Sequence, residues 1–263
     1  MMLRITVRQA TAAVAFALLA AGCRDAASRK GADARVVVTV SAAASLREVM
    51  AEVERGVEAA RPGVDVRVNL GASGALRQQI EQGAEVDVFL SAAEAPMDAL
   101  QRAELVDPRT RRVVAGNTLV LVAPAGATLV NRWEDLALPA VRRVALGAPA
   151  SVPAGDYARQ PLRALGLEAA VERRAVLGNS VRQVLAHVES GEADAGVVYA
   201  TDARTSRGVR VVAPAPAGPH RPITYVLAVV SATRRRDEAV AVAGWVAGPE
   251  GREAFRRHGF RVD

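Results

Sequence analysis

The sequence predicts an α/β protein of two lobes, because short β-branched runs alternate with helical patterns from residue 36 onward and the alternation restarts after residue 142. A chain of 263 residues is long enough for two domains. Apolar residues make up 51% of the chain and charged residues 24%, a balance typical of a folded globular protein. We therefore expect two parallel-sheet lobes with helices packed on the sheets.

The first lobe is expected to begin with three strands, each followed by a helix. The first helix has the clearest pattern, because Leu46, Val49, Met50, Val53 and Val57 recur at helical spacing and form one apolar face. Strand followed by helix in this order predicts a parallel sheet. The expected strands cover residues 36–40, 64–70 and 86–92, and the third helix covers residues 93–102.

The second lobe repeats this order. A helical segment follows the VPAG motif, and Val181, Val184, Leu185 and Val188 lie on one face of a further helix. One terminal helix over residues 237–255 is expected to pack on the first lobe. The expected strands of the second lobe cover residues 143–149, 175–179, 196–200 and 208–214.

Two long apolar strands are expected to connect the lobes. Residues 118–124 follow a turn at Gly116 and Asn117 and lead into the second lobe, and residues 223–230 bring the chain back. Lobe 1 would then comprise residues 34–120 and 228–263, and lobe 2 residues 121–227. Two lobes joined by two crossing strands form a hinged clamp, with a ligand held where the carboxyl ends of the strands face each other.

The first 33 residues have the layout of a signal peptide followed by a tether. Arg4 and Arg8 precede an uncharged run that is too short to span a membrane and leads to Cys23, the single cysteine of the chain. This layout resembles the lipobox of bacterial lipoproteins, in which the cysteine carries a lipid and becomes the first residue of the mature protein. Ala20 stands where leucine is usual, so cleavage by the general signal peptidase stays an alternative. We expect a periplasmic protein, anchored through Cys23 if it is lipidated.

The net charge of +6 does not indicate a nucleic-acid partner. The basic residues are scattered among carboxylates, and aromatic residues are 3% of the chain, whereas nucleic-acid surfaces concentrate positive charge and add aromatic stacking. We interpret the arginines as solvated surface side chains and expect no nucleic-acid binding.

Four junctions between a strand and a helix share the chemistry of an anion site. The motifs are SAAAS before Leu46, GASG before Ala75, SVPAG before Asp156 and GNS before Val181. Each places small residues where the backbone N–H groups of a helix start have no partner within the helix, and such helix starts attract anions. A serine at one of these positions could equally be a plain helix cap, so only their convergence would make a site.

Catalysis has little support in the sequence. Ser73 does not lie in a G-x-S-x-G elbow, because its second glycine follows immediately as Gly74. The histidines His187, His220 and His258 show no metal-ligand spacing and no obvious orienting carboxylate. We therefore expect a binding protein without a resident cofactor, and not an enzyme.

The chain resembles the periplasmic molybdate-binding proteins of ABC importers from about Val36 to its end. The resemblance rests on several long stretches in the same order: VSAAASL, LGASGALRQQIEQGAEVDVFLSA, GNTLVLVAP, LGAPASVPAGDYA, SVRQVLAHVESGEADAGVVYATDA and FRRHGF. It implies a clamp of the type II periplasmic-binding-protein kind and a monomer that delivers molybdate or tungstate to a permease and an ATPase on other chains.

The resemblance also implies five binding positions. In that family two serines, two backbone amides and one tyrosine hold the tetrahedral oxyanion, so that molybdenum enters as its oxyanion and not as a bare ion. These positions correspond here to Ser45, Ser73, the amides of Ala154 and Val181, and Tyr199. A carrier for sulfate or another small anion, a ligand-sensing domain and a hydrolase are the alternatives.

Overall fold

The computed structural model describes residues 35–216, 218 and 221–262. The expected signal peptide and tether, with Cys23, lie outside the described residues. Within the described ranges, no helix is long and apolar enough to cross a lipid bilayer.

Lobe 1 is built on a five-stranded sheet in the order β2-β1-β3-β10-β4. β1, β2 and β3 are parallel, and β10 pairs antiparallel with both β3 and β4. The strands are β1 (Val36–Ala43), β2 (Val64–Gly71), β3 (Val88–Ser91), β4 (Arg112–Asn117) and β10 (Ile223–Val229). The α-helices are α1 (Arg47–Ala60), α2 (Ser73–Glu81), α3 (Glu94–Arg102), α8 (Arg236–Ala247) and α9 (Pro249–Arg257), with 3-10 turns η1 (Ala44–Leu46) and η2 (Pro108–Thr110).

Lobe 2 is built on a second five-stranded sheet in the order β7-β6-β8-β5-β9. β6 pairs in parallel with β7 and β8, and β5 pairs antiparallel with β8 and β9. The strands are β5 (Leu119–Pro124), β6 (Val144–Gly147), β7 (Ala175–Gly178), β8 (Ala195–Tyr199) and β9 (Val209–Pro214). The helices are the 3-10 segment η3 (Trp133–Ala137), α4 (Pro153–Ala164), α5 (Glu168–Glu172), α6 (Val181–Glu189) and α7 (Ala200–Ala203).

The predicted α/β class with two lobes is confirmed. Both sheets are mixed, because β10 in lobe 1 and β5 in lobe 2 pair antiparallel with their neighbours. Each of these two strands is the first one after the chain has passed from one lobe to the other. The chain enters lobe 2 at Thr118 and returns to lobe 1 between Pro214 and Ile223. We propose that the lobe boundaries lie at these two crossings. Each crossing comes a few residues before the boundary expected from the sequence, at positions 120 and 227.

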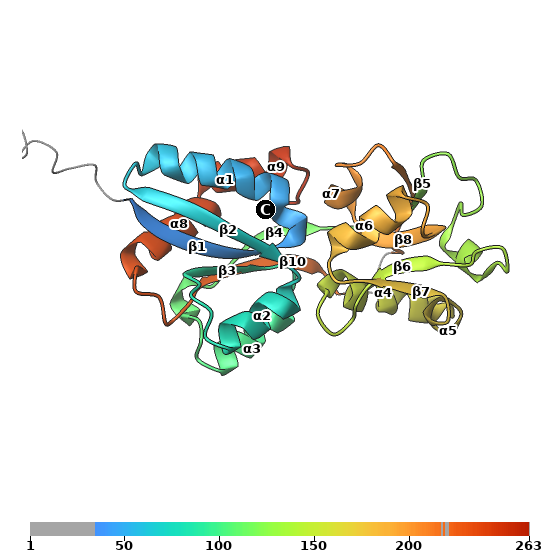
Figure 1. Cartoon of the computed structure of the whole chain (residues 1–263), viewed down its shortest axis with the longest axis horizontal. Helices are drawn as coiled ribbons and strands as arrows, with labels where there is room; N and C mark the ends of the chain where they lie inside the picture. Colours follow the sequence, from blue (N-terminus) through green and yellow to red (C-terminus); the bar gives the residue numbers. More distant parts are fainter. Residues whose placement is uncertain (1–34, 217, 219–220, 263) are drawn as a thin grey trace, which may run out of the picture. The chain divides into compact units, whose positions relative to one another are not determined.

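Helices cover both faces of the lobe 1 sheet (Figure 1), and each face has its own apolar core. On one face, α1 packs against β2 and α8 packs against β1 and β10, and Val49, Met50 and Val242 are buried there. On the other face, α2 and α3 bury Leu76 and Met97 in a separate cluster. The sheet is therefore held from both sides, which fixes the carboxyl ends of its parallel strands.

Two local expectations were wrong. Gly116 and Asn117 belong to β4 and not to a turn, because they continue the antiparallel pairing with Thr224 and Ile223 of β10. The expected single helix over residues 237–255 is two helices, α8 and α9. Pro249 has no N–H and disfavours helical backbone at the residue before it, so α8 ends before Gly248 and α9 starts at Pro249.

Candidate functional site

Helix starts from both lobes meet around one point. β1 leads through η1 into α1, β2 leads into α2, and in lobe 2 the strands β6, β7 and β8 lead into α4, α6 and α7. The first amides of a helix have no carbonyl partner within that helix, and the helix dipole adds partial positive charge there. The fold thus directs unpaired donors from several helices toward a shared space.

That space is a small cavity lined by all five residues that the sequence predicted as a site: Ser45, Ser73, Ala154, Val181 and Tyr199. Its volume is about 10 Å³, which is at the lower limit for holding one water molecule. None of the described residues that line it is charged. The remaining lining residues are Ala43, Ala44, Gly71, Ala72 and Ala92 from lobe 1, and Val152 and Pro153 from lobe 2.

The hydroxyl of Ser45 is oriented by a partner far away in the sequence. The oxygen of Tyr225 lies 2.9 Å from Ser45 Oγ and accepts a hydrogen bond of 3.1 Å from Asn117 Nδ2. Either hydroxyl of this pair can donate to the other; when Tyr225 donates to Ser45, the Ser45 proton is left for a ligand. Asn117 also donates to Thr201 Oγ1 of lobe 2 at 2.8 Å.

Ser73 is prepared for donation in the same way. Its Oγ accepts a hydrogen bond of 3.0 Å from the backbone N–H of Ala92, which leaves its proton free. Ser73 is fully buried at the first position of α2, and its neighbour Gly74 donates a backbone hydrogen bond of 2.9 Å to Ser151 O of lobe 2. The turn around Ser73 therefore also forms part of the contact between the lobes.

The hydroxyl of Tyr199 is buried and has no hydrogen-bond partner among the described residues. Its ring packs edge-on against Tyr225, with ring centroids 6.1 Å apart. Burial raises the pKa of both Tyr199 and Tyr225 well above the usual tyrosine range. Both hydroxyls keep their protons at neutral pH, so Tyr199 is available as a donor.

The amides of Ala154 and Val181 complete the lining from lobe 2. Val181 is the first residue of α6, whose N-cap Ser180 accepts from Gln183 N at 3.2 Å. Ala154 is the second residue of α4, directly after Pro153. Both amides belong to the first helical turn, where no helical carbonyl can pair with them. Together with the three hydroxyls they give the cavity lining five uncharged groups that can donate hydrogen bonds.

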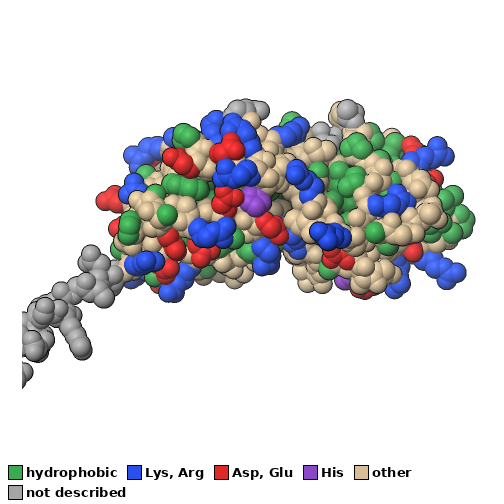
Figure 2. Space-filling model, turned by 90° about the horizontal axis from the view of Figure 1, so that it is seen from above, with side chains coloured by type: hydrophobic (Ala, Val, Ile, Leu, Met, Phe, Trp, Pro, Cys, Tyr) green, Lys and Arg blue, Asp and Glu red, His purple; other side chains and the backbone are tan. Residues whose placement is uncertain are grey.

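The charged side chains of the described residues lie outside the lining of this cavity. Figure 2 shows basic and acidic side chains interspersed over the surface of lobe 1, in agreement with the scattered arginines of the sequence. His187 and His258 are paired with Glu192 and Glu52 at 2.6 and 3.0 Å, so both have a carboxylate neighbour that the sequence did not indicate. In the part of the chain that the structure describes, no group of three metal-ligating side chains gathers.

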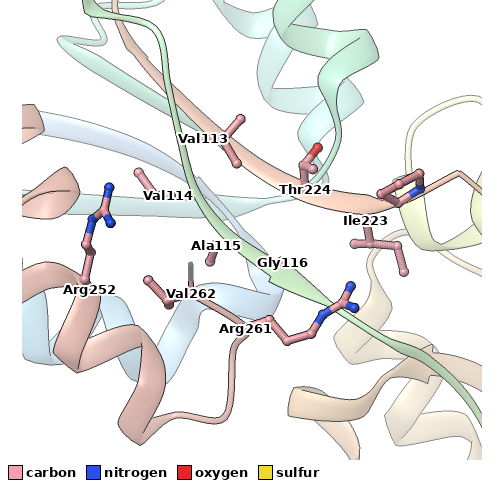
Figure 3. A pocket seen from close by; sticks show the side chains of 10 residues that line it. Val113, Val114, Ala115, Gly116, Ile223, Thr224, Arg252, Arg261 and Val262 are labelled. Atoms are coloured by element: carbon pink, nitrogen blue, oxygen red, sulfur yellow. The ribbon is translucent and has the colours of Figure 1, made fainter.

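A wider pocket on lobe 1 contains none of the five residues. It has a volume of about 420 Å³ and lies between β4, β10 and the C-terminal segment, with Thr224 and the arginines Arg252 and Arg261 in its wall (Figure 3). Arg261 donates to the backbone oxygen of Asn117. The wider pocket is therefore separate from the small cavity where Ser45, Ser73 and Tyr199 come together.

Sequence reasoning missed Tyr225 and Asn117. Tyr225 lies 180 residues after Ser45, and Asn117 lies 84 residues before Thr201. Tyr225 stands within the apolar run that forms β10, where the sequence pattern indicates only a strand. The one local signal was an asparagine next to the crossing between the lobes.

Known proteins similar to this chain are bacterial proteins that bind solutes outside the cytoplasm or serve ABC transporters. The family model for bacterial extracellular solute-binding proteins matches residues 38–261. A putative ABC transporter substrate-binding lipoprotein of Bacillus subtilis, YvgL, is 38% identical over 253 residues, which is 96% of each chain. The molybdate-binding protein ModA of Escherichia coli is 36% identical over 230 residues, covering 86% of this chain and 89% of ModA.

A solved structure shares both the fold and part of the sequence. The substrate-binding domain of a putative molybdenum ABC transporter from Clostridium difficile superposes with a TM-score of 0.67 and 36% identity, covering 87% of this chain and 99% of that chain. The matched family covers both lobes and every residue of the cavity. The chain therefore belongs to the bacterial extracellular solute-binding protein family.

Proposed function

We propose that this protein is the extracytoplasmic binding component of an ABC importer and that it captures molybdate, and also tungstate, in the cavity between its lobes. It would then deliver the oxyanion to a permease powered by an ATPase. The names of the relatives YvgL and ModA support this assignment. The five cavity residues would hold the oxyanion: Ser45, Ser73, Ala154, Val181 and Tyr199.

The observation that carries the proposal is the unpartnered hydroxyl of Tyr199. A buried polar group without a hydrogen bond costs about 1 to 3 kcal/mol, and folded proteins rarely retain one without a reason. Tyr199 lines a cavity whose other polar groups are also donors with a free proton, such as Ser73. A ligand with several acceptor oxygens would satisfy all of them at once, and because such a ligand is larger than the present cavity of about 10 Å³, the lobes would move apart to admit it.

Uncharged donors are sufficient for tight binding of a dianion. Charge-assisted hydrogen bonds contribute about 1.5 to 3 kcal/mol each, so five give roughly 8 to 15 kcal/mol before the cost of lobe closure is subtracted. Micromolar affinity requires about 8 kcal/mol. An arginine in the site is therefore unnecessary.

The same donors favour an oxyanion without protons. Monohydrogen phosphate carries a proton that needs an acceptor, whereas backbone amides only donate and the Ser73 oxygen already accepts from Ala92. Leaving that proton unpaired in a buried site would weaken phosphate binding. Sulfate has no proton, so its exclusion would depend on the diameter of the cavity.

Location, anchoring and oligomeric state complete the proposal. We infer a periplasmic protein anchored through a lipid on Cys23, because the lipoprotein YvgL aligns over 96% of this chain. We also infer a monomer without a resident cofactor. We infer no catalytic role, because no histidine or carboxylate lines the cavity beside Ser45 or Ser73 in the described part of the chain.

A titration with four oxyanions tests the proposal. We expect molybdate and tungstate to bind the purified protein with micromolar or lower Kd in calorimetry, and sulfate and phosphate at least about 100-fold more weakly, a difference of roughly 2.7 kcal/mol. Tightest binding of sulfate would assign the protein to sulfate instead. Tightest binding of phosphate, or no binding at all, would contradict an oxyanion carrier of this kind.

Replacing Tyr199 by phenylalanine should weaken binding without destabilising the protein. We expect the Kd for molybdate to rise about 10- to 100-fold, because one charge-assisted hydrogen bond is lost. The unfolding temperature without ligand should not fall, because the Tyr199 hydroxyl has no partner to lose within the described chain.

The matched control is Tyr157→Phe. Tyr157 is also buried, but it does not line the cavity, and its hydroxyl contacts the backbone of Pro222, at 3.4 Å from the oxygen, and of Thr224. Its Kd should stay within about twofold of wild type, since neither contact involves a group that lines the cavity. Equal losses in both variants would show that Tyr199 acts through packing and not through a ligand contact.

A further inference from the structure

One guanidinium connects acidic side chains of both lobes beside the cavity. Arg182 of α6 donates from Nη1 to Glu48 Oε1 of α1 at 2.9 Å and from Nη2 to Glu48 Oε2. Its Nε lies 2.6 Å from Asp202 Oδ1 of α7, and Nη1 also donates to Thr205 Oγ1 at 3.1 Å. Among the described residues, Glu48–Arg182 is the ion pair that joins a helix of lobe 1 to a helix of lobe 2.

Each member of this cluster closely follows a proposed binding residue. Arg182 comes directly after Val181, and Glu48 comes three residues after Ser45. Asp202 comes three residues after Tyr199, within the helix that starts at the end of β8. The guanidinium therefore bridges three of the elements that supply donors to the cavity.

The cluster is more buried than ordinary surface ion pairs. The side chain of Asp202 is fully buried, that of Arg182 is 18% exposed and that of Glu48 is 37% exposed. Fully exposed pairs contribute little, but this pair is partly buried, and its bidentate geometry makes the contact specific. Losing contact with Glu48 would expose one side of a guanidinium that is otherwise held by lobe 2.

We propose, on the basis of the function proposed above, that Arg182 is a positioning residue that latches the two lobes together around the cavity by binding Glu48 of lobe 1 while Asp202 holds it in lobe 2. The latch contacts no ligand. It stabilises the arrangement in which Ser45, Val181 and Tyr199 face the same space, and it slows the opening that releases the ligand.

Glu48→Gln tests the latch with little risk to folding, because Glu48 is partly exposed and Arg182 keeps its contact with Asp202. We expect the dissociation rate of molybdate, measured by stopped flow, to rise about 3- to 20-fold with a smaller change in the association rate. High salt should weaken binding to wild type more than binding to the variant, since screening acts on the pair that the variant lacks.

The matched control is Glu52→Gln. Glu52 lies one turn further along α1 and pairs with Arg257 and His258, both in lobe 1. This variant should lower the unfolding temperature and leave the dissociation rate within about twofold of wild type, because the lost pair does not cross between lobes. Equal dissociation rates in wild type and Glu48→Gln, or equal losses in Glu48→Gln and Glu52→Gln, would overturn the latch.

A readout without ligand separates this inference from the proposed function. Small-angle X-ray scattering of the ligand-free protein should give a larger radius of gyration for Glu48→Gln than for wild type, with Glu52→Gln unchanged. An identical radius for Glu48→Gln and wild type would overturn the latch even if molybdate binds. Failure of wild type to bind molybdate and tungstate would overturn the proposed function alone, because the scattering comparison needs neither oxyanion.

Discussion

Replacing Gly155 by alanine is expected to abolish tight molybdate binding and to destabilise lobe 2. A Cβ at position 155 would lie 2.0 Å from Gly147 O and 2.6 Å from Gly147 C, at the end of β6. Both atoms are backbone, so no flexible side chain can move aside. The start of α4 must therefore move away from the strand that supports it.

This displacement acts directly on the site, because Ala154 precedes Gly155 and its amide is one of the proposed donors. A shift of about 1 Å would take a normal hydrogen bond beyond the distance at which it forms. We expect Kd to rise about 100-fold or more as this donor is lost and its neighbours are misaligned. Overpacking of this kind typically costs about 1 to 3 kcal/mol of folding free energy.

Gly244→Ala is the control for an added methyl group. Gly244 lies within α8, and a Cβ there would meet nothing within 4 Å. Alanine should leave Kd unchanged and stabilise the protein by about 0.5 to 1 kcal/mol, because glycine is unfavourable inside a helix. Calorimetry and denaturant unfolding of both variants measure the two effects. Wild-type affinity in Gly155→Ala would show that α4 can leave β6 without moving the Ala154 amide.

The helix starts around the cavity could be predicted because their signals are local. Small residues followed by an apolar helical face mark the turns before Leu46, Ala75, Asp156 and Val181, and each turn is a strand-to-helix junction in the structure. The parallel pairing of β1 with β2 and β3 follows from the same alternation, because parallel strands need helical crossovers. The resemblance then selected five positions, which the structure brings to one cavity.

What surrounds the site could not be predicted, because it depends on which elements become neighbours. Tyr225 orients Ser45 only after β10 has been inserted into the lobe 1 sheet. The sequence predicts solvated arginines in general, and nothing near Arg182 in the sequence indicates Glu48, 134 residues earlier. Asn117 was assigned to a turn, whereas its place in β4 lets it bond to both Tyr225 and Thr201. Contacts of this kind carry no local periodicity.

Asp202 should make the protein less stable as the pH rises from about 4 to about 7. Burial raises the pKa of Asp202 from 3.8 to about 7, although the nearby Arg182 opposes the rise; Glu48 also favours the protonated form. Between these two pKa values the folded chain binds a proton that the unfolded chain has released, so the stability of the folded state falls as pH increases. Three units of pKa correspond to a loss of up to about 4 kcal/mol.

Comparison with Asp202→Asn isolates this contribution. Denaturant unfolding at several pH values should show the free energy of unfolding of wild type falling relative to the variant between pH 4 and pH 7 and parallel to it above pH 8. Asp107→Asn provides the opposite sign: Arg109, followed by Arg236, holds the pKa of Asp107 well below its usual range, so its contribution is present above pH 4 and lost in stronger acid.

The outcome also bears on how Arg182 is held. If Asp202 is protonated at neutral pH, Glu48 is the one ionised carboxylate that contacts the Arg182 guanidinium. The positive charge of Arg182 is then neutralised by a residue of the other lobe. Ionisation of Asp202 above pH 7 would supply a second, fully buried partner within lobe 2. Parallel pH profiles for wild type and Asp202→Asn would mean that Asp202 is ionised throughout and that attraction to Arg182 outweighs the cost of burial.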